Sequence, residues 1–182
     1  MPQARLSARC GGGTLAAMIA PRSSFLEGHR RKFLVVIDDT PECDRALIYA
    51  AKRAERTAGG VVLLNIIVPE TDAPQWLGVE EVMRAEALGE AETLMARAAE
   101  RARAIAHVEP EIVIREGGRA EEIMKLIGED TDIAILVLAA GSDSEGPGPL
   151  VTAIAGRAAG TFPIPITIVP GTLSDAEIAA GA

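Results

Sequence analysis

Residues 32–51 read KFLVVIDDTPECDRALIYAA, and this stretch decides the fold. Its aliphatic start, residues 32–39, ends in two carboxylates and predicts a buried strand with the acids at its carboxyl end. Thr40 and Pro41 then suit the cap and first position of a helix, and the apolar residues that follow recur at helical spacing. A strand that leads directly into an amphipathic helix is the building unit of an α/β sheet.

The same alternation continues through the rest of the chain. Further strands are predicted at 61–69, 111–117, 133–140 and 165–170, and further helices at about 79–106, from about 119, and at 149–159. We therefore expect an α/β fold with an open, mainly parallel five-stranded sheet and helices on both faces. The folded domain is expected at 31–171, between a disordered N-terminal tail at 1–30 and a loose C-terminal tail at 172–182.

Composition limits the classes of function. The chain has 182 residues and a net charge of −8, with 18 basic residues scattered among 26 acidic ones. Nucleic-acid binding depends on clustered Lys and Arg, so we expect no nucleic-acid partner. The sequence holds no apolar run long enough to span a membrane and only two cysteines, Cys10 and Cys43. We expect a cytoplasmic protein that does not bind membranes.

The carboxyl edge of the sheet is where a ligand is expected. Asp38 and Asp39 end the first strand, and a glycine-rich loop follows the strand at 133–140. If these two strands are neighbours, the acids and the loop share one crevice. Two alternatives remain open for the acids, which are Mg²⁺ binding and local hydrogen bonding at the helix start.

Several segments, in order, resemble the universal stress protein family. The stretch KFLVVIDDTPECDRALIYAA is similar to that family's first strand, with Asp38 at the family's Asp, and Asp39 and Thr40 in place of its Gly-Ser pair. VVLLNIIVP is similar to the second strand, and Gly117, Ala120 and Ile123 match the start of a later helix. The resemblance covers about residues 32–170 and implies a Rossmann-like fold of the adenine nucleotide alpha hydrolase type.

Members of the family that bind ATP carry Gly-x-x-Gly after the fourth strand and, further on, Gly followed by Ser or Thr. Without gaps, these motif positions fall on Ala139, Ser142, Thr152 and Ala153, none of which keeps the family's residue. An alignment shifted by four residues uses Asp143, Gly146, Gly156 and Arg157 instead, which recovers two glycines but loses the hydroxyl. The loop also carries acids, and Pro147 and Pro149 remove amide donors.

The resemblance implies a non-enzymatic stress-response or regulatory module without strong ATP binding, although weak ATPase activity stays open. The alternative is a member that binds ATP or AMP, with Mg²⁺, through a remodelled loop. In that case the nucleotide-binding residues would be Ile37, Asp38, Asp39, Ile66, Ala139, Ser142, Gly146, Thr152, Ala153 and Gly156. The resemblance also implies a homodimer through the last strand, at Ile166, Thr167, Ile168 and Val169.

Overall fold

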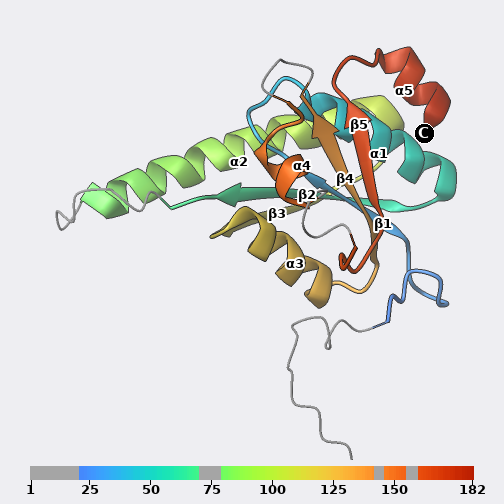
Figure 1. Ribbon diagram of the computed structural model, residues 1–182, viewed down its shortest axis with the longest axis horizontal. Coiled ribbons are helices and arrows are strands. Elements are labelled where there is room, and N and C mark those ends of the chain that lie inside the picture. Colours follow the sequence, from blue (N-terminus) through green and yellow to red (C-terminus); the bar gives the residue numbers. More distant parts are fainter. Residues whose placement is uncertain (1–20, 70–78, 142–145, 155–159) are drawn as a thin grey trace, which may run out of the picture.

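The computed structural model describes residues 21–69, 79–141, 146–154 and 160–182. Five strands and five helices are placed within these ranges (Figure 1). The strands are β1 (Lys32–Val36), β2 (Gly60–Ile67), β3 (Glu111–Glu116), β4 (Ile133–Ala140) and β5 (Ile166–Pro170). The helices are α1 (Cys43–Thr57), α2 (Val79–Ala106), α3 (Arg119–Glu129), α4 (Pro149–Ala153) and α5 (Asp175–Gly181).

The strands form one open sheet in the order β3-β2-β1-β4-β5, and every neighbouring pair is parallel. This confirms the predicted α/β architecture. The three central strands are aliphatic on both faces because helices cover both sides of a parallel sheet. Residues such as Leu34 and Val35, neighbours on β1, are both completely buried but point to opposite faces.

Two hydrophobic clusters fill the two sides of the sheet. On one side, α1, α2 and α5 pack on a cluster that includes Val35, Ala50, Ala98 and Ile178. On the other side, α3 and α4 pack on Leu34 and its neighbours. Figure 1 shows α3 beneath the strands, away from α1 and α5. None of the helices in the described ranges is both long and apolar enough to span a membrane.

The junction between β1 and α1 differs from the prediction. β1 ends at Val36, so Asp38 and Asp39 lie beyond the strand, and α1 begins at Cys43. Thr40 does not cap the helix; its amide and hydroxyl both donate to Asp38 Oδ1, at 3.3 and 2.6 Å. This local turn occupies the residues that the sequence assigned to the end of the strand and the start of the helix.

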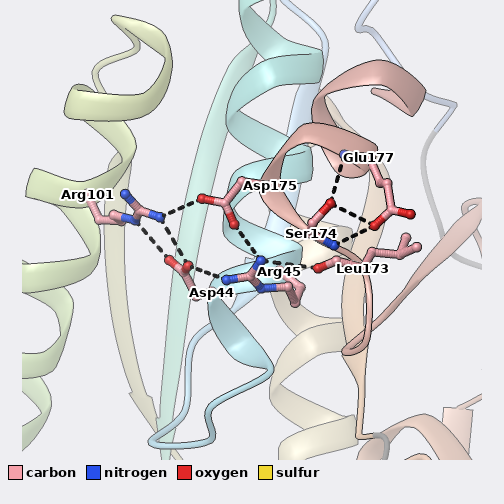
Figure 2. Close-up of polar contacts among 7 residues, drawn as sticks. All are labelled: Asp44, Arg45, Arg101, Leu173, Ser174, Asp175 and Glu177. Carbon is pink, nitrogen blue, oxygen red and sulfur yellow. Dashed lines mark hydrogen bonds and ion pairs between the residues drawn. The ribbon is translucent and has the colours of Figure 1, made fainter.

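The C-terminal residues 172–182 contain the docked helix α5, which corrects the expected loose tail. Ser174 and Glu177 make a reciprocal capping box at the start of α5, and Ile178 is buried against α1. Figure 2 shows Arg45 of α1 and Arg101 of α2 both donating to the carboxylate of Asp175. Packing and ion pairs together hold α5 on the body of the protein.

The N-terminal prediction is corrected in part. Residues 1–20 lie outside the described part of the chain. Residues 21–30 contact the start of β4: Ser23 Oγ donates to Asp132 Oδ1 at 2.6 Å, and Arg22 Nη1 donates to Ile127 O at 2.7 Å. This segment therefore belongs to the folded unit, because it satisfies carbonyls at the end of α3.

Candidate functional site

The ends of β1 and β4 lie side by side at the carboxyl edge of the sheet, and their connections leave toward opposite faces. The segment after β1 leads to α1 on one face, and the segment after β4 leads to α4 on the other. Such a point in a parallel sheet opens a crevice in which ligands bind. The expectation that the acids and the glycine-rich loop share one crevice holds for Asp38, which lines the same cavity as Gly148. Asp39 lines only a second, larger cavity.

A larger cavity of about 880 Å³ lies between the ends of β1 and β2 and the side of α2. Its volume falls in the range of about 300–1,000 Å³ that is usual for small-molecule sites. Its β1 and β2 walls are Val36, Ile37, Asp38, Asp39, Asn65, Ile66 and Ile67, and its α2 wall runs from Glu86 to Arg97. Apolar and charged groups of both signs thus border one open space.

A smaller cavity of about 120 Å³ lies between the start of α1 and the segment that leads into α4. Its lining includes Thr40, Glu42, Ala139, Pro147 and Leu150. Three residues line both cavities: Val36, Asp38 and Arg119. We call these three shared lining residues the neck.

The carboxylate of Asp38 is oriented by its own turn. Thr40 holds Oδ1 through the amide and hydroxyl bonds described above. Asn65 of β2 fixes the same junction, because its Nδ2 donates to the carbonyl of Ile37 at 2.8 Å. Local hydrogen bonding of Asp38, one of the open alternatives, is therefore present, and it leaves the side chain facing both cavities.

The remaining expected nucleotide residues are only partly brought together. Ile37, Asp39 and Ile66 line the larger cavity, and Ala139 lines the smaller one. Gly146 has a positive φ of 97°, and its carbonyl approaches Gly141. Ser142 and Gly156 lie outside the described residues.

Thr152 and Ala153 point away from the site. Both are exposed on α4, and neither lines either cavity. The Thr152 hydroxyl donates back to the carbonyl of Gly148 at 2.8 Å. A hydroxyl held in this way by the preceding turn is not presented to the crevice.

Glu42 contributes a group that the sequence did not single out. A Cβ atom placed on Gly141 would lie 3.1 Å from Glu42 Oε1 and 3.3 Å from the carbonyl oxygen of Gly146. The glutamate carboxylate therefore fills the space at the end of β4 where the loop turns. A carboxylate and a carbonyl oxygen at this point oppose the approach of a polyanion.

Arg119 and Arg97 are cations of the site that were not expected from the sequence. Arg119 is the first residue of α3 and reaches both cavities, and Arg97 lies on the side of α2 that faces the larger one. The signal for Arg119 was its position directly after Gly117 and Gly118, at the end of a strand. Its side chain reaches the crevice only through the three-dimensional packing of β3 next to β2.

The thiol of Cys43 is not a reactive group. Cys43 is 8% exposed, and its Sγ lies 3.6 Å from the carbonyl oxygen of Val36. Burial raises the pKa of the thiol to about 12, so the nucleophilic thiolate is scarce at neutral pH. Among the described residues, no group of three or more His, Cys, Asp or Glu side chains is arranged to hold a metal ion.

Comparisons with known proteins agree with this architecture. Residues 29–170 match the model of the universal stress protein family. No curated protein is a significant match to the chain.

Solved structures share the fold. The universal stress protein UspA from Lactobacillus plantarum is 14% identical, with a TM-score of 0.62 over 77% of this chain and 97% of its own. A universal stress protein in complex with cAMP is 16% identical, with a TM-score of 0.55 over 77% of this chain and 97% of its own. One from Archaeoglobus fulgidus in complex with dAMP is 16% identical, with a TM-score of 0.54 over 76% of this chain and 97% of its own. Taken with the family match over most of its length, the sheet order and the crevice lead to one conclusion: this chain belongs to the universal stress protein family.

Proposed function

We propose that this chain is a non-enzymatic stress-response module of the cytoplasm that acts as a homodimer and does not bind ATP strongly. The observation that carries the proposal is the position of the Glu42 carboxylate against Gly141, at the end of β4. Pro147 and Pro149 beside it offer no amide donors. The adjoining cavity holds only about 120 Å³, which is below the roughly 300 Å³ at which typical ligand sites begin.

The non-enzymatic part of the proposal rests on the groups around the crevice. A covalent mechanism needs an activated nucleophile beside a base. The cysteine at this place, Cys43, is buried and carries a neutral thiol at physiological pH. We therefore assign binding and regulation, rather than a reaction, to this site.

Titration calorimetry of the full chain with ATP and Mg²⁺ tests the proposal. We expect no saturable heat at nucleotide concentrations up to about 100 μM, which corresponds to a binding free energy weaker than roughly −5.5 kcal/mol. A dissociation constant below that concentration would refute it. Absorbance near 260 nm gives a second reading, because the chain has only one Trp and one Tyr to mask a co-purified nucleotide.

Dimerisation is proposed through β5, the edge of the sheet next to β4. The carbonyl of Pro165 accepts from Leu136 N, and Gly171 N donates to Ala140 O, so residues 165, 167, 169 and 171 face β4. Ile166 and Ile168 therefore direct their N–H and C=O groups outward. A second copy running antiparallel would pair each Ile166 with an Ile168 across an axis at Thr167.

A second candidate function is the binding of an adenine mononucleotide with a remodelled phosphate site. The specific observation in its favour is the larger cavity of about 880 Å³ beside Asp38. Two of the structurally similar universal stress proteins hold cAMP and dAMP, which each carry a single phosphate. This candidate is compatible with weak ATP binding, because only the additional phosphates would meet the Glu42 carboxylate.

A further inference from the structure

Arg119 belongs to the neck that the two cavities share. It lines both of them, together with Val36 and Asp38. Its side chain is exposed, and no described residue forms a hydrogen bond or ion pair with it. The neighbouring Arg115, by contrast, is paired with Glu122 and Glu129. Arg119 is thus a cation at the crevice that has no ion-pair partner among the described residues.

The neck also offers a hydrogen-bond acceptor, the carboxylate of Asp38. Asp38 Oδ1 takes both bonds from Thr40, and among the described residues Oδ2 has no partner. A free carboxylate oxygen accepts readily from a hydroxyl group. Beyond it, Ile66 and Leu94 provide apolar surface in the larger cavity, against which a flat ring can pack.

We propose that Arg119 is the phosphate-binding residue of this site and selects a nucleoside monophosphate. The base and sugar would occupy the larger cavity, with a sugar hydroxyl donating to Asp38 and the phosphate held by the Arg119 guanidinium. Arg forms paired, charge-assisted hydrogen bonds to phosphate oxygens. These bonds would take the place of the backbone contacts to phosphate that the segment with Ala139 and Pro147 does not provide. This inference rests on the second candidate function above.

The geometry also explains why one phosphate is favoured over three. Arg119 also lines the smaller cavity of about 120 Å³, and Glu42 lines the same cavity. A β- or γ-phosphate would enter that space and meet the carboxylate. Arg119 therefore stabilises the first phosphate, whereas the Glu42 carboxylate repels a β- or γ-phosphate.

The test is titration calorimetry of the full chain with AMP, adenosine and ATP, using the wild type, Arg119→Gln and Arg53→Gln. Arg53, on α1, lines neither cavity and serves as the matched control. For the wild type and Arg53→Gln we expect AMP to bind at least about tenfold more tightly than adenosine, as charged hydrogen bonds imply. In Arg119→Gln that difference should disappear, with adenosine binding unchanged. Circular dichroism of each variant checks that the fold is retained.

Each contrary result has a separate meaning. If AMP binds the wild type and Arg119→Gln equally, Arg119 is not the phosphate-binding residue, although the mononucleotide function stands. If neither AMP nor adenosine binds at millimolar concentration, both the inference and the mononucleotide function are refuted. If ATP binds the wild type more tightly than AMP, the single-phosphate selectivity is wrong. The proposal of weak ATP binding fails as well if the dissociation constant for ATP lies below about 100 μM.

Discussion

The carboxylate of Glu42 lies against Gly141, so close that a Cβ atom on the glycine would be 3.1 Å from Glu42 Oε1. This contact joins the residue before α1 to the residue after β4. It places a negative charge at the point where phosphate-binding members of α/β folds present amide donors. Under the proposed function, side-chain charge rather than the number of glycines in the loop decides which ligands this crevice accepts.

Replacing Glu42 by Gln should strengthen ATP binding. Glutamine keeps the size of the side chain and removes its charge, so the repulsion of a nearby phosphate falls and the affinity should rise about tenfold. Calorimetry with ATP and Mg²⁺ measures the change. Glu55→Gln, at the far end of α1 in a surface pair with Lys52, is the matched control and should have no effect. An unchanged ATP affinity in Glu42→Gln would show that the lost amide donors, not the carboxylate, limit binding.

Replacing Ile168 by Pro should produce a monomer. Ile168 directs its N–H away from β4 and is 41% exposed, so proline removes a donor from the outer edge and spares the bonds to β4. Sedimentation equilibrium should show a dimer for the wild type and for the control Ile168→Val, and a monomer for Ile168→Pro. A dimer that persists in Ile168→Pro would place the interface elsewhere.

The strands could be predicted from the sequence because their signal is strong and local. The central strands are aliphatic runs buried on both faces, as Leu34 and Val35 show, and glycine and proline mark where they end. The error at the end of β1 has a different origin. Asp38 and Thr40 close a turn through a side-chain bond, which no hydrophobic pattern reveals.

The sequence predicted only those site residues that stand at the ends of strands. Asp38 and Ile66 stand at strand ends, so parallel topology brings them to one edge. Arg119 is the first residue of α3, which lies on the face of the sheet opposite to α1. Its position at the same crevice depends on the packing of β3 beside β2. α5 was missed because a seven-residue helix with one fully buried anchor is too short for periodicity to detect, although its Ser174–Glu177 capping box was readable.

Replacing Ile178 by Ala should destabilise the whole domain. Ile178 is 2% exposed and packs in the cluster between α1 and the sheet, so truncation should lower the free energy of unfolding by about 2–4 kcal/mol. Urea denaturation followed by circular dichroism measures this. Ala180→Ser, an exposed change on the same helix, should cost less than about 0.5 kcal/mol. Equal unfolding midpoints for wild type and Ile178→Ala would mean that α5 adds nothing to stability.

Replacing Asp132 by Asn should reduce the loss of folding stability that occurs as the pH falls. The hydrogen bond from Ser23, with further help from His29 and Lys32, holds the pKa of the Asp132 carboxyl below its ordinary value. A carboxyl whose pKa is lower in the folded state stabilises the protein above its unfolded pKa of about 3.9. That contribution is lost as the pH falls through the lower, folded value. Urea midpoints measured from pH 7 to pH 2 should therefore fall less steeply in Asp132→Asn than in the wild type.

Ser23→Ala removes the main cause of the pKa shift of Asp132. It should also make the urea midpoints fall less steeply with pH, because the folded and unfolded pKa values approach each other. Parallel curves for all three proteins would show that the contact between residues 21–30 and β4 does not couple to folding.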